Sequence, residues 1–307
     1  MSFFRSTFIA LSDAKVLRSF AENSPLAKRV SGRFIAGTTL SEVLSVVEEM
    51  NSLGISVTMD ALGENVSTEA AARRAADLYH DMLEKIASLK LDSNISLKLT
   101  QMGMDLGNDM AESIVGELAQ HAAECKTFLR VDMEGTPYTQ ATLDMVRRLH
   151  ARPSLHDSIG VVVQAYLFRT EMDVDQLLSE GIRLRLCKGA YREPPDLAFP
   201  RKDDVDRNYV LLAKKMLKSR TFHGLATHDE TIIDEIKQFV KTEAIDPKSF
   251  EFQMLYGIRR DLQESLVKEG YRVRAYIPFG GEWYPYFMRR LAERPANVLF
   301  IAKNMLR

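Results

Sequence analysis

The sequence predicts a (β/α)8 barrel of the TIM type, an α/β fold, and three observations support this prediction. Eight short strand-like segments alternate with longer amphipathic, helix-like segments along most of the chain. Polar residues recur on one side of most of these strands, where a barrel has its interior. No glycine-rich turn of the form G-x-G-x-x-G follows the first strand, which disfavours an open doubly wound sheet.

The predicted elements follow one another in a regular order. Apolar residues at helical spacing between about residues 11 and 50 indicate a helical arm, which we assign to residues 1–45. The barrel is expected over residues 46–307. Its strands are predicted at 55–60, 95–100, 128–133, 160–166, 183–188, 223–228, 250–255 and 272–277. Helices are predicted at 69–86, 110–123, 141–149, 208–219, 232–240 and 260–269.

The last predicted helix, residues 281–295, carries a separate signal. Tyr286, Arg289, Arg290 and Glu293 fall on one face of this helix. Two neighbouring arginines form a donor fork suited to a carboxylate, although an Arg-Arg pair is more often a solvated basic face. Because the helix follows the eighth strand directly, it is expected to fold over the mouth of the barrel. The barrel itself is expected to be distorted.

Alternation within the strands predicts a charged barrel interior. Arg130 and Asp132 share one face of the third strand, and Glu251 and Gln253 share one face of the seventh. Most barrels fill this space with branched apolar side chains, and buried charges are costly unless they are paired or hold a ligand. The alternative is an antiparallel sheet with one wet face, which the helical intervening segments disfavour.

Composition excludes several classes of protein. The chain of 307 residues has 41 Lys and Arg against 42 Asp and Glu, so it lacks the basic excess of a dedicated nucleic-acid binder. Cys125 and Cys187 have no disulfide or metal-site spacing and fit a reducing cytoplasm. No apolar run is long enough for a membrane span, and the first residues do not resemble a signal peptide. Peripheral contact with the inner membrane is compatible with the sequence, because such contact leaves a much weaker signal than a membrane span.

Polar side chains also gather at the carboxyl ends of the predicted strands, where barrels bind ligands. Each has an ordinary structural alternative. Asp60 and Lys98 could form a structural ion pair, Asp132 could cap a helix, and His228 could be a buried, hydrogen-bonded histidine. The convergence of all eight strand ends predicts a site. The residues at these ends are Asp60, Lys98, Asp132, Gln164, Arg185 to Lys188, Thr227, His228, Gln253 and Tyr276.

With these strand ends, the chain resembles the proline dehydrogenase family of flavin-dependent barrel enzymes. The matching segments occur in the family's order and extend from the first strand to the last helix. They are 59–64 (MDALGE), 96–99 (SLKL), 131–134 (VDME), 163–166 (VQAY), 185–191 (RLCKGAY), 226–228 (ATH), 252–257 (FQMLYG), 273–278 (VRAYIP) and 289–293 (RRLAE). Arg192 departs from the pattern, because relatives carry an aromatic residue there.

The resemblance implies an activity and its partners. Members oxidise L-proline to Δ1-pyrroline-5-carboxylate, the first step of proline catabolism to glutamate, with FAD as hydride acceptor and a quinone as electron acceptor. We expect a cytoplasmic enzyme, peripheral to the inner membrane. The chain is too short for the aldehyde-dehydrogenase half of some relatives, so a separate pyrroline-5-carboxylate dehydrogenase is expected to take the product.

The resemblance also implies roles for individual residues. Asp132 and Arg185 are the implied catalytic residues, with Arg185 near flavin N5; whether Asp132 transfers a proton or only orients the flavin is open. Asp60 is implied to hold Lys98, and Glu293 to orient the arginine pair. Implied proline contacts are Lys98, Tyr276, Tyr286, Arg289, Arg290 and Leu255. Implied FAD contacts are Met133, Gln164, Arg185, Lys188, Gly189, Ala190, Thr227 and His228.

The positively charged residues implied for the site suggest how the substrate amine loses its proton. A positive cluster of Lys98, Arg185, Arg289 and Arg290 would favour loss of the proline ammonium proton before hydride transfer.

Three alternatives stay open. A related cyclic amino acid such as 4-hydroxyproline could be the substrate, although Tyr276 leaves little room for a hydroxyl group. A metal-dependent hydrolase or Schiff-base aldolase could use Lys98, but no H-x-H pair follows the first strand and no metal is expected. The third alternative is a barrel that has lost its activity and serves as a binding or regulatory module. The intact arginine fork and the complete set of strand-end residues argue against it.

Overall fold

A closed parallel barrel of eight strands forms the centre of the computed structural model, which describes residues 34–284 and residue 286. Each strand pairs with the next in sequence, and the eighth pairs with the first. The predicted fold is therefore confirmed, and each predicted strand overlaps an observed one. The strands are β1 (Ser56–Ala61), β2 (Ser93–Leu97), β3 (Leu129–Val131), β4 (Ile159–Gln164), β5 (Arg183–Cys187), β6 (His223–Ala226), β7 (Phe250–Leu255) and β8 (Arg272–Phe279).

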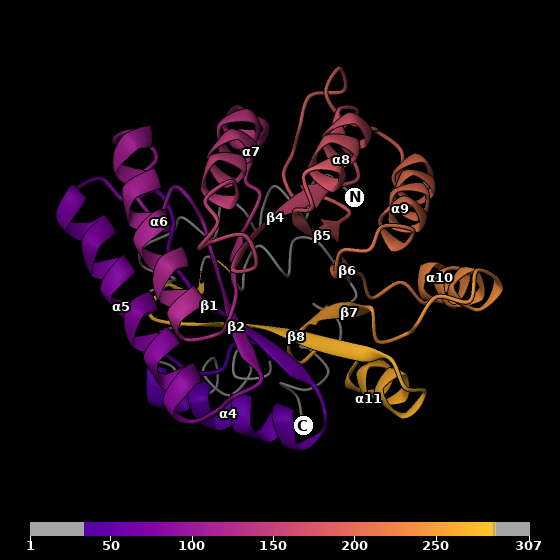
Figure 1. Cartoon of the computed structure of the whole chain (residues 1–307), viewed down its shortest axis with the longest axis horizontal. Coiled ribbons are helices and arrows are strands. Elements are labelled where there is room, and N and C mark those ends of the chain that lie inside the picture. The colour runs from indigo at the N-terminus through magenta and orange to yellow at the C-terminus, as the bar shows by residue number, and fades with distance from the viewer. Residues whose placement is uncertain (1–33, 285, 287–307) are drawn as a thin grey trace, which may run out of the picture.

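Helices surround the barrel (Figure 1). Those that follow the first seven strands are α5 (Glu69–Ser88), α6 (Asn108–Glu124), α7 (Thr136–His150), α8 (Thr170–Ser179), α9 (Lys202–Leu217), α10 (Glu230–Thr242) and α11 (Arg260–Lys268). Helix α8 has no counterpart among the helices predicted from the sequence. It is short and buries only Thr170, Val174 and Leu177, so its apolar periodicity is weak.

Helix α4 (Leu40–Ser52) precedes the barrel and packs against β1 and β8. Thr39 and Glu42 form a capping box at its first turn, which fixes where the helix begins. Glu49 of α4 pairs with Arg260 of α11 at 2.6 Å, which ties the helix into the ring. The expected boundary between residues 45 and 46 falls inside α4. The earlier part of the expected arm lies outside the described residues.

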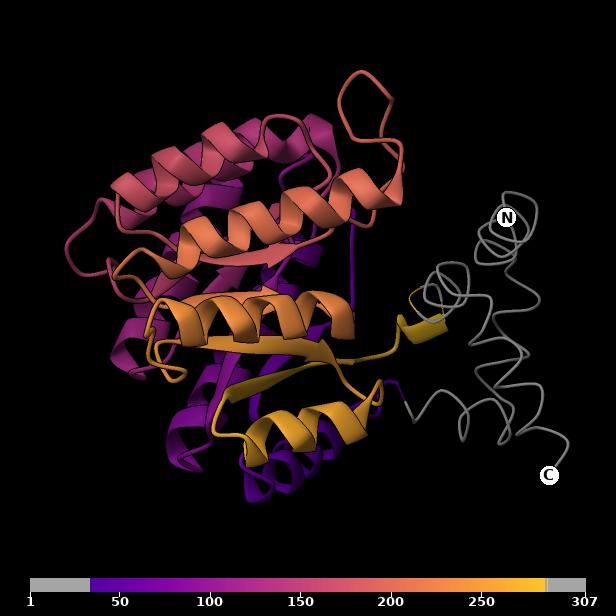
Figure 2. The same cartoon turned by 90° about the vertical axis from the view of Figure 1, so that its right-hand side faces the viewer.

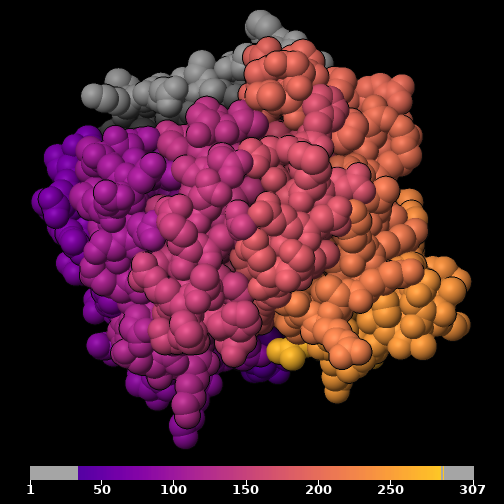
Figure 3. Space-filling model, turned by 45° about the horizontal axis from the view of Figure 1, so that its top comes forward, coloured from indigo at the N-terminus to yellow at the C-terminus, as the bar shows by residue number. Residues whose placement is uncertain are grey.

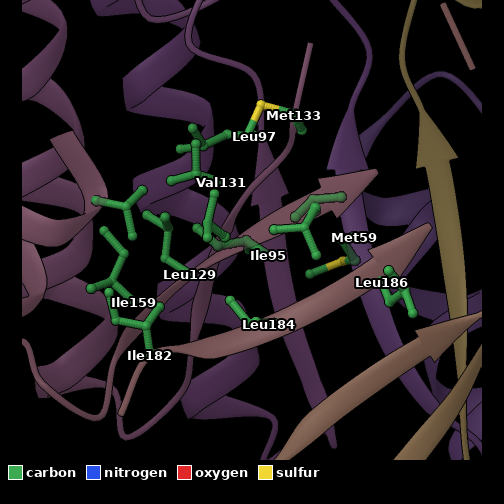
Figure 4. Close-up of a cluster of buried hydrophobic side chains, with 14 of the residues drawn as sticks. Met59, Ile95, Leu97, Leu129, Val131, Met133, Ile159, Ile182, Leu184 and Leu186 are labelled. Atoms are coloured by element: carbon green, nitrogen blue, oxygen red, sulfur yellow. The ribbon is translucent and has the colours of Figure 1, made fainter. Parts of the chain in front are cut away.

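Apolar side chains point away from the barrel axis and meet the helices, as the alternation predicts. Figure 4 shows this cluster around β2 to β5. Ile95 and Leu97 of β2, Val131 of β3 and Leu184 of β5 have no exposed surface. Burying side chains of this size stabilises the fold by about 1.5–3 kcal/mol each. The polar side chains of the same strands therefore point into the barrel interior. No helix among the described residues is long and apolar enough to cross a membrane.

Stability is expected to depend on pH through His223, the first residue of β6. Its Nδ1 accepts a hydrogen bond from Leu184 N at 3.0 Å. Burial, Arg130 and Arg183 lower the pKa of His223 from 6.5 to about 3. Between those pH values the unfolded chain binds a proton that the folded chain does not. Stability should therefore fall by about 1.4 kcal/mol per pH unit as pH drops. Urea unfolding at several pH values should give a slope that is smaller by about this amount in His223→Asn than in the native protein.

Candidate active site

Charged side chains from four strands meet at the carboxyl end of the barrel. Lys98, just beyond β2, places its Nζ 3.1 Å from Asp60 Oδ2 and 3.6 Å from Asp132 Oδ2. Arg185 Nη1 of β5 donates to Asp132 Oδ1 at 2.9 Å. The Tyr276 hydroxyl of β8 lies 2.6 Å from Asp60 Oδ2 and 2.9 Å from Asp132 Oδ2. We call Asp60, Lys98, Asp132, Arg185 and Tyr276 the strand-end cluster. The expected pair between Asp60 and Lys98 is present.

Burial and charge set opposite protonation tendencies for the two carboxyl groups. Burial raises the pKa of Asp60, and the neighbouring Asp132 adds to this effect. Burial also acts to raise the pKa of Asp132, but Lys98, Arg185 and hydrogen bonds from Ser96 and Tyr276 lower it below its usual value. Asp132 is therefore an anion at neutral pH, whereas Asp60 is the carboxyl group that more readily takes a proton.

The described cations of the cluster are balanced by carboxylates. Burial acts to lower the pKa of Lys98, but Asp60 and Asp132 raise it well above the usual value, so this ammonium stays charged. Lys98 and Arg185 thus face two carboxyl groups, and this part of the site carries no large positive excess. The expected positive cluster would depend on Arg289 and Arg290. These two residues and Glu293 lie outside the described residues.

Hydrogen bonds beneath the cluster fix Arg185. Its Nε donates to Gln253 Oε1 at 2.5 Å, and its two terminal nitrogens reach Ser96 Oγ at 3.2 Å and Thr58 Oγ1 at 3.4 Å. With the bond to Asp132, these contacts use four of the five N–H groups of the guanidinium. One N–H group is left for a ligand within the part of the chain that the structure describes.

The network of polar side chains continues from Gln253 down the barrel interior to Glu251 and Arg274, which were not assigned to the site from the sequence. Gln253 Nε2 donates to Glu251 Oε1 at 2.6 Å, and Arg274 Nε donates to the same oxygen at 2.7 Å. The alternation that placed Arg130 and Asp132 inside the barrel also identifies Glu251, Gln253 and Arg274. Tyr79 of α5 is different. Its hydroxyl reaches Ser96 O at 2.9 Å, and no strand pattern could have revealed a residue on a helix.

The predicted cofactor contacts lie on the adjacent ends of β4, β5 and β6 and on the loop after β3. Gln164 is buried and donates to Glu134 O at 3.1 Å. His228 Nε2 accepts from Leu255 N at 2.9 Å. Lys188 Nζ lies 2.5 Å from Asp206 and 2.9 Å from Asp229. Thr227 and Met133 are buried at the same barrel end.

The loop after β5 carries Lys188, Gly189 and Ala190 and projects from the carboxyl end of the barrel (Figure 2). It stands out from the surface in Figure 3. Glu193 ties it to α7, because Glu193 Oε1 accepts from Thr136 N at 2.9 Å. Gly189 has φ +119°, and a Cβ built there would lie 2.2 Å from the Tyr166 ring. The ring of Tyr166 thus requires glycine at this position, and the predicted contact between the Gly189 backbone and the cofactor stays a prediction.

Replacing Gly189 with alanine is expected to destabilise the protein by at least about 1–3 kcal/mol, because the residue would be strained and would clash with Tyr166. Urea unfolding measures the change. Gly107→Ala is the matched control, since Gly107 has extended backbone (φ 164°) and no atom lies within 4 Å of the position that a Cβ would take there. Equal stability of the two variants would contradict the steric argument.

The expected proline contacts on the last helix are described only in part. Tyr286 is helical and buried. Leu255, at the end of β7, is half-buried beside the barrel mouth. Pro285 and residues 287–307, with the arginine fork, are outside the described residues.

Comparison with known proteins decides the family. A model of the family described as proline dehydrogenase matches residues 43–303. The chain is 40% identical to proline dehydrogenase 2 of Bacillus subtilis (strain 168) over 301 residues, which covers 98% of both chains. The chain belongs to the proline dehydrogenase family. It is also 38% identical to proline dehydrogenase of Deinococcus radiodurans, over 90% of this chain and 89% of the relative.

A solved structure confirms the barrel of this proline dehydrogenase family member. Proline utilization A (PutA) from Bdellovibrio bacteriovorus, inactivated by N-propargylglycine, superposes with a TM-score of 0.82 at 24% identity. The match covers 91% of this chain but only 34% of the PutA chain. The family resemblance and the barrel are thus confirmed, while the roles of individual site residues stay predictions.

Proposed function

We propose that this chain oxidises L-proline to Δ1-pyrroline-5-carboxylate. The observation that carries the proposal is the strand-end cluster, which lies at the barrel end that binds ligands in this fold, in a member of the proline dehydrogenase family. Lys98 supplies one described cation for the substrate carboxylate, and Arg289 and Arg290 are proposed to supply the others. Tyr276, Tyr286 and Leu255 would enclose the pyrrolidine ring.

FAD is the proposed hydride acceptor, and the donors at the carboxyl end of the barrel fit it. The ends of β4, β5 and β6 form one continuous edge, and Arg185 keeps one N–H group free for a ligand among the described residues. When bound, FAD would supply the two-electron acceptor that no side chain provides. The residues proposed to hold it are Met133, Gln164, Arg185, Lys188, Gly189, Ala190, Thr227 and His228.

The protein's own contribution to the chemistry is orientation and charge. The amine of proline must be neutral before hydride leaves the neighbouring carbon, because a cationic nitrogen cannot push out a hydride. The charged Lys98 would hold the substrate carboxylate and disfavour a second cation nearby. Asp132, ionised between Lys98 and Arg185, would hold both cations in place rather than store the proton.

Further partners are proposed on the family alone. A quinone would take the electrons, and a separate pyrroline-5-carboxylate dehydrogenase would consume the product. The enzyme would work in the cytoplasm, peripheral to the inner membrane, where a quinone is reached.

The test is the visible spectrum of the purified protein before and after anaerobic addition of L-proline. Flavin bands that bleach with proline would support cofactor, substrate and hydride transfer together. Bands that bleach only with 4-hydroxyproline would reassign the substrate. A protein that neither carries nor takes up FAD would overturn the proposal.

A further inference from the structure

The opposite, amino-terminal mouth of the barrel contains a second group of charges, which the proposed function does not use. A cavity of about 590 Å³ lies there, between the starts of the strands and the helix-to-strand loops. Its charged lining residues are Lys90, Asp92, Lys126, Asp157, Arg183 and Arg274. This end of a barrel is ordinarily devoted to stability, so uncompensated charge there needs a reason.

Arg183, the first residue of β5, presents an unused guanidinium group to this cavity. Its central carbon stacks 4.2 Å from the centre of the Phe128 ring and 5.1 Å from that of Phe222. No described residue accepts a hydrogen bond from this guanidinium, and its Nε is buried without a partner. Two aromatic rings therefore hold the group in place while its donors are free. A preorganised arginine of this kind loses little entropy when it binds an oxyanion.

Positive charge exceeds negative charge beneath the cavity. Arg130 is 2% exposed, and its Nε is also buried without a partner. Glu251 is the one fully buried carboxylate nearby among the described residues, and it already pairs with Arg274. Burial, together with Arg185 and Arg183, lowers the pKa of Arg130 well below its usual value. Arg130, Arg183 and Arg274 thus share Glu251 as their one buried counter-charge among the described residues, which leaves an excess of positive charge.

The carboxylates that line the cavity offset this excess only weakly, since Asp157 acts on Arg183 without pairing with it. Asp92 has 60% of its side chain exposed, accepts a hydrogen bond from Ser56 and lies 4.0 Å from Arg274. Asp157 forms no ion pair with any described residue. An exposed carboxylate at such a distance is strongly screened by water. Lys90 and Lys126 also line the cavity and are exposed. Positive side chains at the cavity therefore outnumber negative ones.

We propose that the amino-terminal mouth is a binding site for a small oxyanion, a phosphate or carboxylate group held by Arg183 and Arg274, with Lys90 and Lys126 at its rim. The planar fork of an arginine matches the oxygens of either group. The bound anion would neutralise the excess charge shared by Arg130 and Arg183. The ligand would stabilise the folded chain by ordinary mass action.

The test is titration calorimetry of the flavin-loaded protein with sodium phosphate, and separately with sodium acetate, against sodium chloride of equal ionic strength. Melting temperature is measured in the same solutions. Arg183→Met should weaken binding about tenfold, the value of one charge-assisted contact. Lys126→Gln, at the rim, should weaken it less and is a second variant if Arg183→Met fails to fold. Arg201→Met is the matched control and should change nothing, because the Arg201 side chain is 70% exposed at the N-cap of α9.

The titrations with phosphate and with acetate distinguish the two classes of ligand. Binding of phosphate alone would assign the site to phosphoryl groups, and binding of acetate alone to carboxylates; both outcomes support an oxyanion site. The proposal is overturned if neither anion binds the native protein beyond chloride. It is equally overturned if Arg183→Met and Lys126→Gln both bind as tightly as the native protein. Failure of proline to bleach the flavin would leave this result unaffected.

Discussion

Replacing Asp132 with alanine is expected to lower kcat/KM for proline by about a hundredfold or more. This carboxylate lies 2.9 Å from Arg185 and 3.6 Å from Lys98 and accepts from Ser96 at 2.6 Å, so its loss frees both cations of the strand-end cluster. Removing one preorganised electrostatic group from an active site has effects of this size. Steady-state kinetics with proline, after correction for bound flavin, measures the change.

Asp132→Asn separates charge from shape. The amide keeps the size of the side chain but removes the negative charge, so it should lose most of the activity that alanine loses. Because the pKa of Asp132 is held below its usual range, the native kcat should not show an acidic limb from this residue near neutral pH. Near-native kcat/KM in Asp132→Ala would contradict the assignment, provided that flavin content and melting temperature are unchanged.

Replacing Arg274 with methionine is expected to destabilise the protein by about 3–5 kcal/mol. Arg274 and Glu251 form a buried ion pair, with 9% and 3% of their side chains exposed and 2.7 Å between Nε and Oε1. Removal of the cation leaves a buried carboxylate without its charged partner, which is far costlier than the pair is favourable. Urea or thermal unfolding of the purified variant measures the loss.

The double variant Arg274→Met with Glu251→Gln is the control for this prediction. It removes both charges together, so most of the lost stability should return. Gln253 would also lose its charged acceptor in the double variant, and flavin-linked activity should fall modestly through Arg185. A double variant as unstable as Arg274→Met alone would show that packing, and not the unpaired charge, causes the loss.

Local patterns in the chain were sufficient for the barrel and for part of its site. Strand alternation placed Ile95 and Leu97 outside and Arg130 and Asp132 inside, because side chains change face at every residue whatever the rest of the fold does. The pair between Asp60 and Lys98 was predictable for the same reason, since β1 and β2 are neighbours and both residues lie at the carboxyl ends of these strands. Helix α8 was missed because its buried face is too small to produce a clear period.

Contacts across the barrel were decided only by the tertiary structure. Arg185 of β5 reaches Asp132 just after β3 and Gln253 of β7, and neither β3 nor β7 is a neighbour of β5 in the sheet. Such contacts depend on barrel diameter, strand stagger and side-chain length, and no local period encodes these quantities. The same holds for Lys188, whose ammonium meets Asp206 on α9 and Asp229 after β6. The sequence by itself determined which faces are polar; closure of the barrel decided which charges become partners, because only closure brings distant strands within hydrogen-bond reach.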